Sequence, residues 1–218
     1  MTYTIYYWPM AGRAGAAIRM LDEAKVAYVH KSEFPEIASV CSAFGAAGSS
    51  FAPPVLVDGD TVISQSGPVA MYIGQKHGFD VPEGQTAKAA QFLNDFADFY
   101  SECAARVGGE KDPKKFFNER CKTWMAVLER NCKGPFFFGD KMSYVDFTVW
   151  SGFCFMKEYF VDQLKKETNI DIFDNCPKLV ALCDKMNSLE SFKNSKLEWT
   201  RDGFRNKISA ETLAVIKA

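Results

Sequence analysis

Two short segments of this sequence place polar side chains where a helix is expected to begin. In the first, Tyr7 ends a β-branched and aromatic run, and Arg13 falls in the first turn of an alanine-rich stretch. In the second, Gln65 and Ser66 precede another helix-like run. Free backbone N–H groups and a positive dipole collect at such a helix start, and together with a hydroxyl they suit a carboxylate. These two segments are therefore the first candidates for binding a small anionic molecule.

Two more segments carry residues that could take part. Pro53 and Pro54 lead into a predicted hairpin, and a proline there is a candidate for a cis peptide bond. Asp95 and Asp98 lie near the start of the first long helix expected in the chain. The predicted topology brings most of these segments to one edge of one small domain.

Each of these residues also has an ordinary structural explanation. Tyr7 could be a core tyrosine with a satisfied hydroxyl group, and Ser66 could be a plain helix N-cap. Arg13 and Asp95 could be solvated surface charges. The signatures of phosphate-binding loops, dinucleotide-binding loops, zinc peptidases and serine hydrolases are all absent. With only two histidines, a Cys/His zinc site of ordinary spacing cannot be built, so no metal is expected.

Composition excludes several other classes of protein. The chain has 218 residues, with 26 Lys and Arg against 27 Asp and Glu, and this balance argues against a nucleic-acid partner. Nineteen phenylalanines can build a core, and the longest uncharged stretch, residues 37–57, is broken by glycines and prolines, so no membrane association is expected. No secretory signal is visible at the N-terminus, and the seven cysteines form no CxxC pair. A reduced, cytoplasmic compartment is the prediction.

The order of predicted elements indicates an α/β domain followed by an all-α domain. Residues 1–78 alternate short strands and helices, residues 79–85 resemble a linker, and residues 86–218 contain only helical patterns. The first two strands should be parallel, because a helix joins them. In the helical part, Ser143 and Asp146 have the spacing of a capping box, and the segment after Ser191 has no clear pattern. The predicted elements are strands at 2–7, 26–30, 55–57 and 61–63 and helices at 12–24, 35–44, 66–77, 86–107, 113–131, from 143 onward and from 177 to 186.

With these motifs in order, the sequence resembles the cytosolic glutathione transferases over nearly its whole length. The N-terminal part is similar to the thioredoxin-like domain of that family, and the Tyr-type site together with Phe34-Pro35-Glu36-Ile37 is most similar to the sigma class or a near relative. The matching strings are Tyr7-Trp-Pro-Met-Ala-Gly-Arg13, Ala52-Pro53-Pro54-Val55-Leu56, Asp58-Gly59, Gln65-Ser66, Gly139-Asp140 and Ser143-x-x-Asp146.

The resemblance implies a function and a role for each matching residue. Glutathione would be the co-substrate, and its thiolate would attack a small hydrophobic electrophile, with peroxidase or isomerase activity as further options. Tyr7 would donate its hydroxyl to the glutathione sulfur, and Arg13 would add positive charge nearby. The γ-glutamyl carboxylate would be held by Gln65 and Ser66.

The remaining expected contacts involve both halves of the chain. Pro54 would be the cis proline, with Pro53 and Phe34 also facing glutathione. Asp95, with Asp98 as its rival, would reach across a homodimer to the partner's glutathione. The electrophile pocket is expected between Trp8, Met10, Tyr100 and Arg106.

Three departures from the family pattern affect glutathione binding. Pro53 has no N–H group, so the usual pair of backbone bonds to the cysteinyl unit loses its donor, at a cost of about 1 kcal/mol. Ala38 stands where sigma-like members carry a lysine, and Phe34 stands where they carry a tryptophan. The glycyl carboxylate would then need other partners, such as Lys31 or the serines at positions 49 and 50.

Two alternatives from other functional classes stay open. A thiol–disulfide oxidoreductase uses the same small domain but needs a cysteine at the start of the first helix, whereas the nearest here is Cys41. A non-catalytic or structural relative of the transferases is the stronger alternative, because Pro53 and Ala38 both weaken the expected glutathione contacts.

Overall fold

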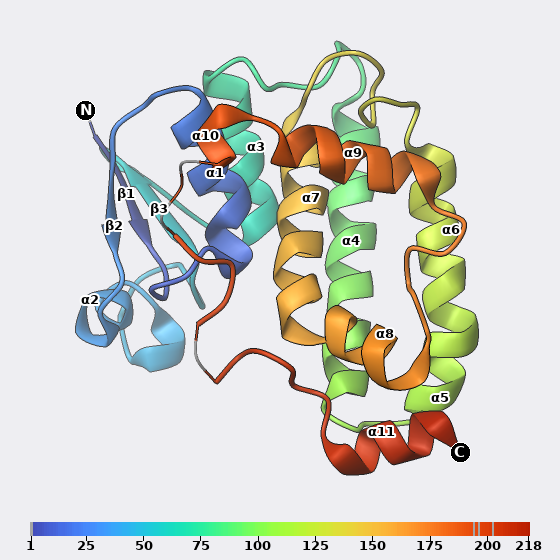
Figure 1. Ribbon diagram of the computed structural model, residues 1–218. Helices are drawn as coiled ribbons and strands as arrows, with labels where there is room; N and C mark the ends of the chain where they lie inside the picture. The colour runs from blue at the N-terminus through green and yellow to red at the C-terminus, as the bar shows by residue number, and fades with distance from the viewer. Residues whose placement is uncertain (1, 194, 196, 202) are drawn as a thin grey trace.

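The computed structural model of the chain describes residues 2–193, 195, 197–201 and 203–218. Figure 1 shows a small sheet with its helices on one side of the molecule and a group of long helices on the other. This arrangement confirms the predicted fold class, a thioredoxin-like N-terminal region followed by an all-helical region.

The N-terminal region is built on a four-stranded mixed sheet with the strand order β2-β1-β3-β4. β1 pairs with β2 in parallel, as the helical connection between them predicts, and β3 pairs antiparallel with both β1 and β4. Gly59 takes a positive φ of 59° in the turn between β3 and β4, which glycine adopts without strain. The elements are β1 (Tyr3–Tyr6), η1 (Gly12–Ala14), α1 (Gly15–Glu23), β2 (Tyr28–Lys31), α2 (Phe34–Ala38), η2 (Ser42–Phe44), β3 (Val55–Asp58), β4 (Thr61–Ser64) and α3 (Ser66–Lys76).

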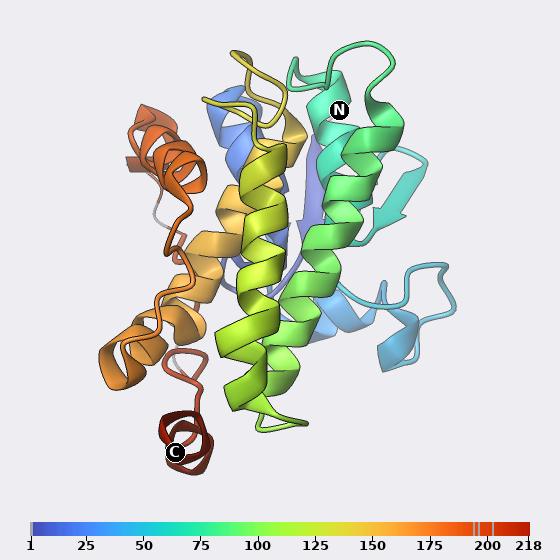
Figure 2. The ribbon, with the colours of Figure 1, turned by 90° about the vertical axis from the view of Figure 1, so that its right-hand side faces the viewer.

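Within the described residues, the elements after α3 are all helical, and α4 and α6 run side by side (Figure 2). The predicted helix over residues 113–131 is continuous but contains a π-helical turn, η3, so it is divided into α5, η3 and α6. The elements are α4 (Thr86–Val107), α5 (Pro113–Lys115), η3 (Phe116–Arg120), α6 (Cys121–Asn131), α7 (Tyr144–Met156), η4 (Lys157–Val161), α8 (Asp162–Thr168), α9 (Pro177–Asn187), α10 (Glu190–Lys193) and α11 (Ala210–Lys217).

The start of α7 confirms the capping box predicted from the sequence. Ser143 is the N-cap, and its backbone N–H donates to the Asp146 carboxylate at 2.8 Å. The same carboxylate accepts a bond from the Phe137 N–H at 2.7 Å, which ties the preceding loop to the helix. Asp146 is fully buried, and burial raises the pKa of its carboxyl group to about 6.

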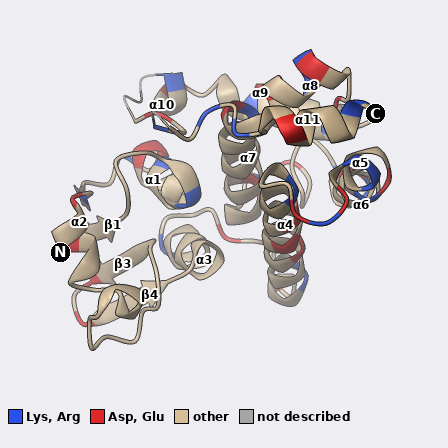
Figure 3. Ribbon diagram, turned by 90° about the horizontal axis from the view of Figure 1, so that it is seen from below, with Lys and Arg blue, Asp and Glu red and all other residues tan. Residues whose placement is uncertain are grey.

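Helix α7 is the element on which the two regions meet. It packs against α1 and α3 of the N-terminal region and against α4 of the helical region. The contact with α3 needs a residue without a side chain, because a Cβ atom on Gly74 would lie 2.7 Å from the Cβ atom of Tyr144. Seen from below in Figure 3, the sheet with α1 and α3 lies beside the pair α4 and α7. This junction is where the predicted site residues come together.

Two global features concern the cysteines and possible membrane spans. All seven cysteines are free thiols; five of them are buried, and Cys154 and Cys183 are partly exposed. Among the helices within the described residues, none is both long and apolar enough to cross a lipid bilayer.

Candidate active site

Tyr7 lies directly after β1, and its phenol is only 4% exposed. The phenolic oxygen accepts a hydrogen bond from the backbone N–H of Arg13 at 2.8 Å. Within the described part of the chain, that oxygen has no second hydrogen-bonding partner, so its own proton is available for donation. The loop fits closely around the phenol: Gly12 has a φ of +40°, and a Cβ atom there would lie 2.7 Å from the Tyr7 oxygen.

The electrostatic surroundings keep the Tyr7 phenol in its neutral form. Burial is the largest influence and raises its pKa above the ordinary value of about 10. The hydrogen bond from the Arg13 N–H and the positive charges of Arg13 and Arg201 lower the pKa in part. A phenol of this kind is a hydrogen-bond donor at neutral pH rather than a base.

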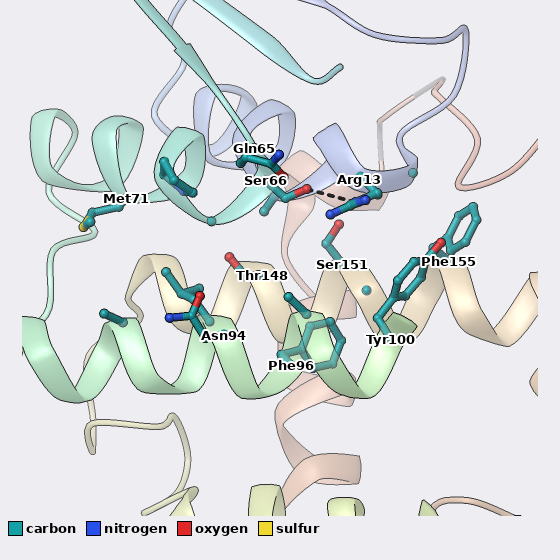
Figure 4. Close-up of a pocket in the computed structure, with 18 residues that line it drawn as sticks. Arg13, Gln65, Ser66, Met71, Asn94, Phe96, Tyr100, Thr148, Ser151 and Phe155 are labelled. Carbon is teal, nitrogen blue, oxygen red and sulfur yellow. Dashed lines mark hydrogen bonds between the residues drawn. The ribbon is translucent and has the colours of Figure 1, made fainter. Parts of the chain in front are cut away.

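Beside Tyr7, a cavity of about 450 Å³ opens between the N-terminal region and the helices α4 and α7. One wall is formed by the starts of the first and third helices, and the other by one face each of α4 and α7 (Figure 4). The lining residues are Gly12, Arg13, Ala16, Gln65, Ser66, Gly67, Pro68, Met71, Ala90, Leu93, Asn94, Phe96, Ala97, Tyr100, Thr148, Ser151, Gly152 and Phe155.

Arg13, Gln65 and Ser66 meet on the first wall, as the sequence predicts. The Nε atom of Arg13 donates to the Ser66 hydroxyl oxygen at 3.3 Å, and the Arg13 guanidinium lies 5.9 Å from the centre of the Tyr100 ring. Gln65 has φ 74° and ψ 138°, an unusual backbone for glutamine, at the point where α3 begins. The result is a cation and a helix N-terminus side by side, which suits a carboxylate.

The prediction that Ser66 caps α3 is wrong. Gln65 is the N-cap residue, Ser66 is the first residue of the helix, and no side chain accepts a capping bond there. Because its hydroxyl bonds to Arg13 instead, Ser66 faces the cavity.

The structure brings only one of the four residues expected around the electrophile to this cavity. Tyr100 lines it, and burial raises the pKa of the Tyr100 phenol. Arg106 lies six residues further along α4, which is about 1.7 helical turns, so its side chain leaves the helix about 120° away. It lines a separate hollow together with Phe116 and does not reach the cavity.

The other two expected residues also lie outside the lining. Met10 is buried in the core and is 3% exposed. Trp8 stacks on Phe34 with ring centres 6.4 Å apart and planes within 4° of parallel, and Phe44 packs edge-on against both rings. Phe34 is 56% exposed, so this aromatic cluster of Trp8, Phe34 and Phe44 forms a surface beside the Tyr7 loop.

The remaining predicted residues are not part of the cavity lining. The peptide bond between Pro53 and Pro54 is cis, as expected for this position. Asp95 is half-buried on α4 and accepts a bond from Gln91 at 3.1 Å, while Asp98 is exposed. Neither aspartate lines the cavity.

The sequence analysis missed the contribution of α7 to the cavity. Thr148, Ser151, Gly152 and Phe155 lie on one face of the helix and line the cavity, and Figure 4 shows Ser151 close to Arg13. Their spacing of three, four and seven residues forms a stripe along the helix, in which Thr148, Ser151 and Gly152 are small or polar among mainly apolar neighbours. That stripe is the signal from which these residues could have been predicted.

Both the helical region and the overall fold of this chain are similar to known proteins. Residues 94–194 match the family model described as the glutathione S-transferase C-terminal domain. The helical region is therefore similar to the C-terminal domain of glutathione S-transferases. No curated protein matches the sequence.

Solved structures share the fold over most of the chain. Prostaglandin synthase D of Nilaparvata lugens is 23% identical, with a TM-score of 0.70 over 88% of this chain and 96% of its own. The Pi-class glutathione S-transferase of Onchocerca volvulus is 18% identical, with a TM-score of 0.73 over 94% of this chain and 100% of its own. The monomeric glutathione S-transferase Na-GST-3 of Necator americanus is 20% identical, with a TM-score of 0.67 over 88% and 95%. The resemblance to cytosolic glutathione transferases is thus confirmed in the fold of both regions.

Proposed function

We propose that this chain is a glutathione transferase that joins the glutathione thiolate to small hydrophobic electrophiles. The observation that carries the proposal is the cavity itself. One wall presents Arg13, Gln65 and Ser66, which suit a carboxylate, and the facing helices present mainly apolar and aromatic side chains. The Tyr7 phenol lies directly against Gly12 at the edge of this cavity.

Tyr7 is the proposed thiolate donor. Its oxygen accepts a bond from the Arg13 N–H, so its proton is free to point toward a sulfur atom. A thiol has a reference pKa of about 8.5, and a hydrogen bond to a charged group is worth about 1.5–3 kcal/mol, or roughly one to two pKa units. A bond of this strength makes the thiolate a substantial fraction at neutral pH, and the thiolate is the nucleophile.

The γ-glutamyl end of glutathione is assigned to the start of α3. There the Arg13 guanidinium lies beside the N–H groups of the helix and bonds to the Ser66 hydroxyl. Two sources of positive charge thus converge on one point, which favours a carboxylate. At the cis bond, Pro53 can offer only its carbonyl oxygen to the cysteinyl unit, because proline has no N–H.

We also propose a homodimer in which Asp95 contacts the glutathione of the partner subunit. Asp95 does not line the cavity of its own chain, so it could contact glutathione only in a second copy. The solved relative from Necator americanus is described as monomeric, which makes the oligomeric state worth measuring directly. Light scattering at micromolar concentration should give twice the mass of the chain. A monomer in this measurement would reject the proposed contact of Asp95 with the partner's glutathione. In the dimer, Asp95→Asn should lower glutathione affinity more than Asp98→Asn, and equal effects of the two substitutions would not support Asp95 over Asp98.

The test of the enzymatic function combines a binding and a turnover measurement. Calorimetry should detect glutathione binding, and the protein should conjugate glutathione to a nitro-activated aryl chloride. A panel that adds hydroperoxides and isomerisable substrates then identifies any peroxidase or isomerase activity. Absence of both binding and turnover would reject the proposal.

A non-catalytic relative of the transferases is the second candidate. The observation that favours it is the burial of Tyr7, which is 4% exposed and not part of the cavity lining. Glutathione binding without turnover on the whole panel would support this function in place of the first.

A further inference from the structure

The chain that follows α10 lies against the loop that carries Tyr7. The described residues of this C-terminal segment, 197–201 and 203–207, run between the sheet and the helices before the chain reaches α11, and they pass close to α1 (Figure 1). The backbone N–H of Ala11 donates to the carbonyl of Glu198 at 2.7 Å, and the N–H of Gly12 donates to the carbonyl of Trp199 at 3.0 Å. Two consecutive bonds of this kind fix the segment to the loop.

The same segment is held from the other side by η4. The Thr200 hydroxyl donates to the Glu158 carboxylate at 2.6 Å, and the Lys207 N–H donates to the carbonyl of Tyr159 at 2.8 Å. Arg205 pairs with Glu158 at 3.4 Å and with Glu198 at 3.1 Å. Because the segment is bonded to the Tyr7 loop on one side and to η4 on the other, the backbone between these bonds is held in position.

Arg201 lies in this part of the segment, and it is a cation without an acidic partner among the residues that the structure describes. The carbon atom of its guanidinium lies 5.6 Å from the centre of the Trp8 ring and 5.1 Å from that of Phe204. A guanidinium held against aromatic faces keeps the donors at its edge free for a planar anion. Arg201 is partly exposed, and its charge lowers the pKa of the Tyr7 phenol, so its field reaches the proposed reaction centre.

The other cation that the sequence suggests for this side of the site is already engaged. Lys31 pairs with Glu36 at 3.8 Å and lies 5.5 Å from the centre of the Tyr6 ring. Lys31 is therefore already engaged by Glu36 and the Tyr6 ring, whereas Arg201 lies over Trp8, whose ring stacks on the exposed Phe34.

We propose that Arg201 binds a carboxylate group of a molecule held at Tyr7. This inference rests on the proposed function, in which Arg13 and Ser66 take one carboxylate of glutathione. Glutathione has a second carboxylate on its glycyl residue, and an aromatic electrophile stacked on Trp8 and Phe34 can carry one as well. Both are planar anions of the kind that the edge of a guanidinium binds through two parallel hydrogen bonds.

Two pairs of compounds separate these sources. The first pair is glutathione and its glycyl ethyl ester, and the second is an aryl chloride that bears a carboxylate and the methyl ester of that compound. For at least one pair, kcat/KM of the wild-type protein should favour the free acid by about tenfold or more, as expected for a charge-assisted bond. Arg201→Gln should abolish that preference by lowering kcat/KM much more for the acid than for the ester, and Arg201→Lys should restore part of it.

Lys207→Gln is the matched control, because Lys207 belongs to the same segment and lies 5.8 Å from the centre of the Phe204 ring. It should leave both acid-to-ester ratios unchanged. If Arg201→Gln keeps both wild-type ratios, or shifts only the pH profile of turnover, Arg201 binds no carboxylate and the inference is wrong. A wild-type protein that neither binds nor uses glutathione would instead reject the proposed function.

Discussion

Replacing Tyr7 by phenylalanine tests the proposed chemistry most directly. The change removes one oxygen atom and keeps the buried ring, so the packing around β1 should be retained. A lost hydrogen bond to the thiolate is worth about 1.5–3 kcal/mol, which raises the pKa of the bound thiol by roughly one to two units. Turnover at neutral pH should therefore fall by at least about tenfold, with little loss of glutathione affinity.

The assay is the rate of conjugation to an aryl chloride between about pH 6 and 9.5. Because the variant loses thiolate population rather than reactivity, its rate should approach that of the wild type at the alkaline end, and the midpoint of the profile should move upward by the same one to two units. Calorimetry provides the glutathione affinity under the same conditions.

The same substitution also has a structural cost that must be separated from catalysis. The Arg13 N–H donates to the Tyr7 oxygen at 2.8 Å and would be left without that partner, at a cost of about 1–3 kcal/mol of folding free energy. Denaturant unfolding measures this term. Tyr6→Phe, the same change on the neighbouring residue, should leave turnover unaltered. Unchanged turnover in Tyr7→Phe, or an equal loss at every pH, would refute the assignment of Tyr7 as thiolate donor.

Three further outcomes follow from the geometry. Asp146→Ala should lower the free energy of unfolding at pH 7 by about 2 kcal/mol or more in urea, since it leaves buried donors unpaired, whereas the exposed Asp140→Ala should not. Burial raises the pKa of Asp146 in the folded state to about 6, so the folded chain binds more protons than the unfolded chain between about pH 4 and 6. The free energy of unfolding of the wild type should therefore fall as pH rises through this window, and the difference in this free energy between wild type and Asp146→Ala should become smaller. Gly12→Ala should reduce turnover at least as much as Tyr7→Phe, because the added Cβ atom would lie 2.7 Å from the phenol oxygen of Tyr7. Gly45→Ala is the control: Gly45 also has a positive φ but has no neighbour within 4 Å, so this variant should keep normal turnover in the same assay.

Local chemistry explains why so much of the fold could be predicted. Ser143 and Asp146 specify the start of α7 through bonds within four residues, and Thr86–Val107 forms one helix that ends at two glycines. The hairpin of β3 and β4 follows from the turn at Gly59. Interactions of this kind depend only on neighbours in sequence, so they can be recognised without a three-dimensional structure.

The candidate site was predictable only where it depends on such helix starts. Arg13, Gln65 and Ser66 meet because two helices begin at the same edge of the sheet. Arg106 was misplaced because its direction depends on the rotation of α4 against its neighbours. The contribution of α7 was missed because Thr148 and Ser151 face the cavity only once α7 packs against α1 and α3.

By itself, the sequence determined the order of strands and helices, the cis proline as a candidate, and the pairing of a phenol with a helix start. Tertiary structure alone decided how deeply Tyr7 is buried, which face of each helix lines the cavity, and that the C-terminal segment lies on the loop at Ala11 and Gly12. The physical reason is the distance along the chain between the residues that interact. A cap or turn is stabilised by atoms a few residues apart, whereas the bond from Gly12 to Trp199 joins residues that only the completed packing of both regions brings together.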